Sequence, residues 1–277
     1  MYKIISDTSC DLTKEEIKGL GIEYVPFKIA IDGVEYEDDD NLNIKEYLEK
    51  MEKTENPIKT ACPSPYDYLK IIEENKDKDI YILTVSSKLS GSYNSAKIAE
   101  QEAKDKFKEI KIHVIDTKSA SAGHTRIVLK LLDLLKDKSF EEVIPAINKE
   151  INSEVTMFVL ESMKNLIKNG RIKKSAGLIA NVLNIRPIMI SNDGEIELFE
   201  INRGIKKSLD KMVRAIGTEC KVNKPNLVTI SYVKNKERAE KIKKKIEEIY
   251  DGVKVHIRHT NGLSSGYADI GGIVIAF

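Results

Sequence analysis

The chain has 277 residues, 41% of them hydrophobic and 32% charged, which is typical of a folded globular protein with one large or two ordinary domains. Its 45 basic and 44 acidic side chains nearly cancel, so net charge gives no reason to expect nucleic acid as a partner. No apolar run is long enough to span a membrane and no signal peptide opens the chain.

The three cysteines, Cys10, Cys62 and Cys220, are scattered and lack the spacing of a zinc site or a disulfide framework. No His, Asp and Glu set has metal-ligand spacing either. We therefore expect a protein of the reducing cytoplasm, with no metal, no cofactor and no integral membrane segment.

In the first half of the chain, short β-rich runs end in segments rich in small hydroxyl residues. The runs 2–5, 80–85 and 112–115 lead into segments 7–11, 86–92 and 116–121. Parallel strands bring their carboxyl ends to one edge of a sheet, where ligands bind in open α/β folds. We expect these three segments to converge there.

Other early segments predict the frame of this domain. Thr13 followed by Glu16 predicts a capping box that starts a helix. Residues 24–31 predict one strand, and the acidic residues 35–40 lack the pattern of a calcium loop and are interpreted as solvated surface. Two prolines fix the loop at 59–65, which presents Thr60.

The segment 79–96 predicts a buried strand, a turn containing Ser90, Gly91 and Ser92, and then a helix. Backbone N–H groups and hydroxyls at a helix N-terminus favour an anion, either a carboxylate or a phosphate. The alternative that these serines only cap the helix and fill the loop is equally compatible with the spacing.

The pattern changes after residue 151. Gly170 is interpreted as the end of a helix that leaves Arg171 exposed on a turn, and the run from Asn192 to Gly194 predicts a β-hairpin. A hairpin does not belong to a simple β-α repeat. We therefore predict an α/β protein with an N-terminal parallel-sheet α/β/α domain, 1–152, and a C-terminal two-layer α+β domain, 153–277.

Catalytic motifs are missing from the sequence. There is no phosphate-binding P-loop, and the residues around Ser90 do not form the G-x-S-x-G turn of a serine hydrolase. His124 and His259 occupy plausible site positions, but the sequence shows no partner for either. The remaining hydroxyls, amides and arginines indicate a binding site, and we name no catalytic residue.

The ordered motifs together resemble the DegV family of fatty-acid-binding proteins over essentially the whole chain. They are SDTSCDL at 6, TACPSP at 60, SSKLSGSYNSA at 86, VIDTKSASAG at 114, NGRI at 169, LNIRPI at 183 and Arg203. The resemblance implies two α/β domains with one long-chain fatty acid, such as palmitate or oleate, buried between them. Some members present this acid to a fatty acid kinase.

The resemblance also implies roles for individual residues. Thr60 and Ser90 would hold the carboxylate, with Arg203 nearby and Arg171 facing the kinase. Tyr267 stands where the family has a histidine in the head-group network, and Asp269-Ile270-Gly271 replaces its G-P-G. The acyl tail would enter the second domain, where the available apolar residues are Leu160, Ile167, Leu178, Ile179, Val182 and Ile188.

The function expected from sequence is a non-catalytic fatty acid carrier. The alternative is a small-molecule phosphotransferase-like enzyme that uses the Ser90–Ser92 turn as its anion site. A third interpretation is a regulatory or scaffold protein whose lipid is structural.

Overall fold

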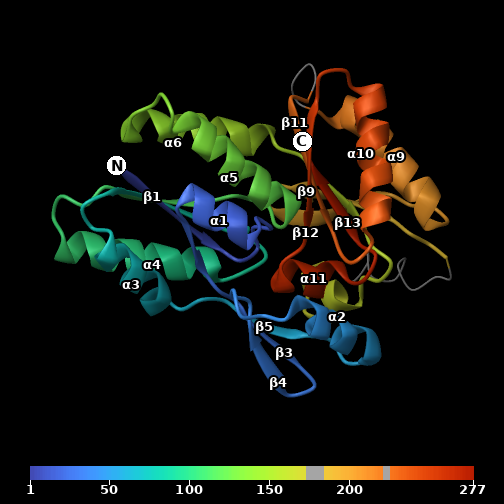
Figure 1. Cartoon of the computed structure of the whole chain (residues 1–277), viewed down its shortest axis with the longest axis horizontal. Helices are drawn as coiled ribbons and strands as arrows, with labels where there is room; N and C mark the ends of the chain where they lie inside the picture. The colour runs from blue at the N-terminus through green and yellow to red at the C-terminus, as the bar shows by residue number, and fades with distance from the viewer. Residues whose placement is uncertain (173–183, 221–224) are drawn as a thin grey trace.

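The computed structural model describes residues 1–172, 184–220 and 225–277, which build two main sheets with a small third one beside them (Figure 1). The first sheet is parallel, with its strands in the order β2-β1-β6-β7. Its strands are β1 (Tyr2–Asp7), β2 (Ile22–Val25), β6 (Asp79–Thr84) and β7 (Ile112–Asp116).

Helices cover both faces of this parallel sheet (Figure 1). Ile4 and Ile5 are neighbours on β1 and point to opposite faces, as alternation along a strand requires. Ile4 packs in the core beneath α5 and α6, and Ile5 packs in the core beneath α3 and α4. These helices are α3 (Pro65–Glu74), α4 (Ser92–Lys106), α5 (Ala122–Leu134) and α6 (Phe140–Ser153). The predicted α/β/α layering is confirmed.

Helix α1 (Lys14–Leu20) begins as predicted. The Thr13 side chain accepts from the Glu16 amide at 3.2 Å, and the Glu16 carboxylate accepts from the Thr13 amide at 2.9 Å. These two bonds satisfy amides that have no partner inside the helix.

The small third sheet is antiparallel, in the order β4-β3-β5. It contains β3 (Lys28–Ile31), β4 (Val34–Glu37) and β5 (Lys59–Ala61), and α2 (Ile44–Lys53) connects β4 to β5. The prediction of one strand over 24–31 is therefore wrong. The chain leaves the parallel sheet after Val25 and joins the antiparallel sheet at Lys28, with Pro26 between them, where no backbone N–H is available for a ladder.

The second main sheet is mixed and has the order β10-β9-β8-β13-β11-β12. Helices α9 (Ile205–Glu219) and α10 (Lys236–Ile249) pack on one of its faces. Its strands are β8 (Thr156–Val159), β9 (Ile188–Asn192), β10 (Glu195–Glu200), β11 (Leu227–Tyr232), β12 (Lys254–His259) and β13 (Ile273–Ala276). The predicted hairpin at Asn192–Gly194 joins β9 to β10, and the expected α+β arrangement is confirmed.

The other face of the mixed sheet packs towards the first half of the chain. Phe158 of β8 and Phe27, just before β3, belong to one continuous apolar core. Two short helices, α7 (Lys164–Lys168) and α11 (Gly262–Ala268), lie at this junction. Helix α6 ends at Ser153, close to the predicted domain boundary after residue 152. Because α11 of the second half packs against α2 of the first half, this boundary stays a prediction.

Asp38, directly after β4, binds the first turn of α11. Its two carboxylate oxygens accept from the amides of Gly262, at 2.7 Å, and Leu263, at 2.8 Å. Asp38 is buried, and burial raises the pKa of its carboxyl to about 7. The interpretation of 35–40 as solvated surface is therefore wrong at Asp38.

Candidate functional site

The three hydroxyl-rich segments converge at the carboxyl edge of the parallel sheet, as predicted. Asp7 joins two of them, because its carboxylate accepts from the Val85 amide at 2.9 Å and from the Ser92 hydroxyl at 2.6 Å. The third segment is joined where the Ser121 amide donates to the Ser9 carbonyl at 2.9 Å. Burial raises the pKa of Asp7 to about 6.

A cavity lies between this edge and the inner face of the mixed sheet, and both halves of the chain contribute to its wall. Apolar side chains form much of its surface, with hydroxyl groups at several positions. The lining residues are Ser9, Phe27, Thr60, Val85, Leu89, Ser90, Ser119, Ala120, Ser121, Thr156, Phe158, Leu160, Leu166, Arg171, Ser191, Ile196, Leu263, Ser264, Tyr267, Ala268 and Val274.

Thr60 and Tyr267 meet in one part of the cavity wall. Thr60 lies on β5 and Tyr267 on α11, and their hydroxyl oxygens are 2.8 Å apart. Asn165 of α7 holds both segments, since its Oδ1 accepts from the Ile58 amide at 3.1 Å and its Nδ2 donates to the Gly266 carbonyl at 2.7 Å. Thr60 and Tyr267 are both half-buried.

Ser90 and Arg171 also line the cavity. The Ser90 hydroxyl oxygen accepts from the Ser92 amide at 3.2 Å, and Arg171 Nε donates to the Leu89 carbonyl at 2.9 Å. Arg171 is partly buried, so the prediction that it is exposed on a turn is wrong. Among the described residues that line the cavity, Arg171 alone carries a positive charge.

Three other predicted site residues are not in the cavity wall. The Ser92 hydroxyl points to Asp7 and lies 2.7 Å from the Tyr68 hydroxyl, both buried. Gly91 is exposed and precedes α4 as its N-cap. Arg203 is also exposed and lines a separate surface hollow with Gly204 and Ile205. The structure thus brings Thr60, Ser90, Tyr267 and Arg171 together and leaves Arg203 apart.

The residues expected around the acyl tail have different locations. Leu160 lines the cavity and Ile167 packs against the same core, but Ile188 belongs to the core beneath α9 on the opposite face of the sheet. Leu178, Ile179 and Val182 lie outside the described residues. Asp269 is not in the cavity wall, and its carboxylate accepts from the adjacent Ile270 amide at 2.8 Å.

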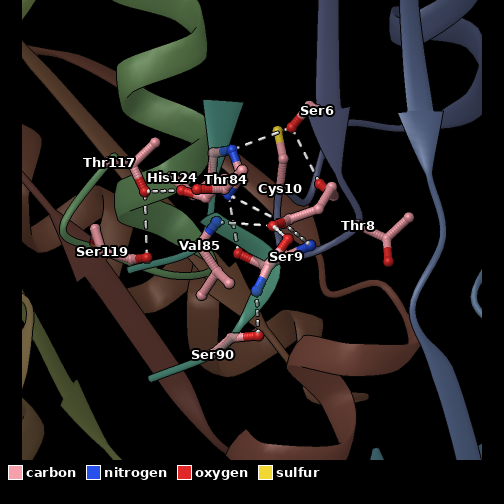
Figure 2. Close-up of polar contacts among 12 residues, drawn as sticks. Ser6, Thr8, Ser9, Cys10, Thr84, Val85, Ser90, Thr117, Ser119 and His124 are labelled. Atoms are coloured by element: carbon pink, nitrogen blue, oxygen red, sulfur yellow. Dashed lines mark hydrogen bonds and ion pairs between the residues drawn. The ribbon is translucent and has the colours of Figure 1, made fainter. Parts of the chain in front are cut away.

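A buried histidine lies behind the wall, in a network that the sequence did not reveal. His124 Nδ1 is 2.9 Å from the Ser9 hydroxyl oxygen and Nε2 is 3.0 Å from that of Ser6 (Figure 2). Burial lowers the pKa of His124 to about 3, so the ring is neutral at physiological pH. Its nearest carboxylate oxygen, on Asp7, lies 3.6 Å from Nδ1, the same nitrogen that contacts Ser9. A catalytic triad needs the carboxylate on the opposite nitrogen, so this network is not one.

Two further polar residues of the cavity wall, Ser119 and Thr156, were also missed as site residues. The Ser119 and Thr156 hydroxyl oxygens are 2.8 Å apart, and Thr156 donates to Glu154 at 3.1 Å. Ser119 lies in a hydroxyl-rich segment that was noted in the sequence, but Thr156 begins a strand and has no motif around it. Only the packing of two sheets brings the pair together.

Within ranges 1–172, 184–220 and 225–277, no group of three or more His, Cys, Asp or Glu side chains could hold a metal ion. Among the described helices, none is both long and apolar enough to cross a bilayer.

Comparison with known proteins gives the family. Residues 1–277 match the family described as "Uncharacterised protein, DegV family". The chain belongs to the DegV family. A DegV domain-containing protein of Streptococcus pyogenes serotype M1 is 33% identical over 280 residues, covering 100% of this chain and 99% of the relative.

Solved structures of DegV proteins share the whole fold. A Ruminococcus gnavus protein, refined with vaccenic acid, has a TM-score of 0.91 and 36% identity, with 100% of this chain and 99% of that chain covered. A Eubacterium eligens protein loaded with heptadecanoic acid has a TM-score of 0.90 and 30% identity, with the same coverage of both chains. The Streptococcus pneumoniae Fatty Acid Kinase (Fak) B3 protein loaded with linoleic acid has a TM-score of 0.89 and 32% identity, again with 100% of this chain and 99% of that chain covered.

Proposed function

We propose that this DegV family protein binds one long-chain fatty acid, such as palmitate or oleate, in the cavity between its sheets. The carboxylate would lie at Thr60, Ser90 and Tyr267, and the acyl chain would run along the inner face of the mixed sheet. The observation that carries the proposal is that two of the three hydroxyl protons of Thr60, Tyr267 and Ser90 have no acceptor among the described residues.

The donors can be counted. Thr60 and Tyr267 carry two hydroxyl protons, and their mutual hydrogen bond uses one, which leaves the other for a ligand. Ser90 accepts from the Ser92 amide, and among the described residues its own proton has no acceptor. A carboxylate accepts hydrogen bonds only, so it complements this end of the cavity. The guanidinium of Arg171 adds a positive charge on the same wall.

The rest of the wall suits an acyl chain. Phe27, Phe158, Leu160, Leu263 and Val274 line the cavity and belong to its surrounding apolar core. Burying a chain against such surfaces contributes about 0.8 kcal/mol per CH₂ before ordering costs. Two or three hydroxyl donors are then enough to fix the orientation of the acid.

We further propose a carrier role in lipid transport or fatty acid metabolism, in the cytoplasm, with a fatty acid kinase as the partner. The structural likeness to the Streptococcus pneumoniae Fatty Acid Kinase (Fak) B3 protein supports a kinase as the partner. The half-buried state of Thr60, Ser90 and Tyr267 supports a carboxylate near the cavity mouth, where a second protein can reach it. Three free thiols suit a reducing compartment.

Titration of the delipidated protein with palmitate tests the proposal. A Thr60→Val/Ser90→Ala double variant should bind at least about tenfold more weakly, because hydrogen bonds to a charged group contribute about 1.5–3 kcal/mol each. Ser87→Ala is the matched control, since Ser87 is exposed on the same turn and absent from the cavity wall. Equal affinity in the double variant and the wild type would contradict the proposed head-group site, and nucleotide-dependent turnover would favour the phosphotransferase alternative.

A further inference from the structure

The cavity has a second polar end, far from Thr60 and Tyr267. Thr156 and Phe158 of β8 and Leu160, the residue just after it, alternate along the chain and all line the cavity. Leu160 lies near the Thr60 end, because α7 follows it closely and is tied to both Ile58 and Gly266. At ~3.3 Å per residue, Thr156 is then ~13 Å further along the wall.

Three hydroxyl residues gather at this distal end. Thr156 and Ser119 lie within hydrogen-bonding distance of each other, and Ser191 of the neighbouring strand β9 continues the register in which Met157 pairs with Ile190, which brings it beside Thr156. Ser9 lies between the two ends, because its carbonyl accepts from Ser264 of α11 and from the Ser121 amide. Ser119 and Thr156 are buried, unlike the half-buried hydroxyls at the Thr60 end.

The proton of each distal hydroxyl is directed into the protein. Thr156 donates to the Glu154 carboxylate at 3.1 Å, which leaves Ser119 to donate to Thr156 or to Glu154. Ser191 donates to the Lys118 carbonyl at 3.1 Å. Each hydroxyl keeps at least one oxygen lone pair as an acceptor.

The direction of the Ser9 bond follows from the buried histidine. Ser6 donates to the Asp7 carbonyl at 3.0 Å, so its oxygen accepts from His124 Nε2. The neutral ring then carries no proton on Nδ1, and Nδ1 accepts from Ser9. Ser9 therefore also offers only an acceptor to the cavity (Figure 2).

The two ends of the cavity thus have opposite hydrogen-bonding character. The Thr60 end offers protons and suits a carboxylate, whereas the distal end offers lone pairs and suits a donor. An unsubstituted alkyl chain would cover these lone pairs and leave them without a partner, which is unfavourable in a buried site.

We propose that the distal hydroxyls of Ser119, Thr156 and Ser191 bind a hydroxyl group on the acyl chain, so that the preferred ligand is a hydroxylated long-chain fatty acid. This inference rests on the proposed function and names its ligand class. A fully extended acyl chain advances slightly further per bond than a pleated strand, so beside β8 it spans the ~13 Å in roughly ten bonds. The hydroxyl is therefore expected near the middle of an 18-carbon chain.

The test compares 18-carbon acids that share one carboxylate. Delipidated protein is titrated at pH 8.5, where Glu154 is ionised, with stearic, 3-hydroxystearic, 10-hydroxystearic and 12-hydroxystearic acids. We expect the 10- or 12-hydroxy acid to bind about tenfold more tightly than stearic acid, an advantage of one good buried hydrogen bond. The 3-hydroxy acid places its hydroxyl near the carboxylate and should gain nothing.

A Ser119→Ala/Thr156→Val variant should lose this preference while still binding stearic acid, which also shows that the variant is folded. If both mid-chain hydroxy acids bind no more tightly than stearic acid to the wild type, the inference is wrong and the fatty acid site itself stands. A preference that persists in the double variant would also contradict it. Failure to bind any of the four acids would overturn the proposed function.

Discussion

The hydroxyl oxygens of Thr60 and Tyr267 lie 2.8 Å apart although 207 positions separate the two residues in sequence. One comes from a short edge strand of the small sheet and the other from a helix near the end of the chain. Their contact connects the two halves of the chain at the end of the cavity where we place the carboxylate. It also puts a phenol where the family resemblance implies an imidazole.

Removal of this phenol should weaken fatty acid binding. Tyr267→Phe keeps the ring and deletes the oxygen, so palmitate affinity should fall by about tenfold, the value of one hydrogen bond to a charged group. In a double-mutant cycle with Thr60→Val the two losses should be less than additive, because each substitution breaks the same pair. Tyr66→Phe, at a 72% exposed tyrosine, is the control. Fully additive losses would show that the two hydroxyls act separately.

Ser90 and Ser92 should have different roles despite their proximity. Ser92→Ala removes the buried bonds to Asp7 and Tyr68, so the free energy of unfolding should drop by about 1–3 kcal/mol with little change in palmitate affinity. Ser90→Ala should weaken binding and leave stability nearly unchanged. Urea unfolding and palmitate titration of both variants measure the two effects. A binding loss confined to Ser92→Ala would reverse this assignment.

The two arginines implied by the family resemblance should differ in their effect on palmitate affinity. Arg171→Gln removes the positive charge from the cavity wall, and palmitate affinity should fall about three- to tenfold, as expected for a partly screened charge. Arg203→Gln should change affinity by less than about twofold, since Arg203 is exposed in another hollow. A larger effect at Arg203 than at Arg171 would mean that the carboxylate lies elsewhere.

The buried carboxyl of Glu154 predicts a pH dependence of stability. Burial raises its pKa from the ordinary 4.5 to about 7, so between those values the folded protein holds a proton that the unfolded chain releases. The free energy of unfolding should therefore fall as pH rises from about 4.5 to about 7, by an amount on the order of 3 kcal/mol from this group.

Glu154→Gln should remove that part of the decline, measured by urea unfolding at pH 5 and pH 8. Asp7 and Asp38, whose pKa values are also raised, contribute equally in both proteins and serve as an internal reference. The same fall with pH in the variant and the wild type would contradict a proton held at Glu154.

Local sequence signals predicted the elements that depend on local chemistry. The capping box of Thr13 and Glu16, the strand and helix on either side of the Ser90 turn, and the hairpin at Asn192–Gly194 each need only a few neighbouring residues. The convergence of the strand ends around Asp7 could also be predicted from the sequence, because parallel strands bring their carboxyl ends to one edge of the sheet.

The predictions from sequence were wrong for residues whose environment depends on partners distant in the chain. Asp38 looked like solvated surface because its partners, the amides of Gly262 and Leu263, lie more than 220 positions away. Arg171 looked exposed because the Leu89 carbonyl that binds it comes from the other half of the chain. The distal hydroxyl of Thr156 had no motif, since its site role arises only when β8 packs over Ser119.

Native mass spectrometry of the protein purified from cells, followed by denaturation and identification of the released lipid, tests the central claim most directly. We predict one long-chain fatty acid, such as palmitate or oleate, per protein chain. Folded protein that carries no lipid and takes up neither added palmitate nor added oleate would contradict the claim.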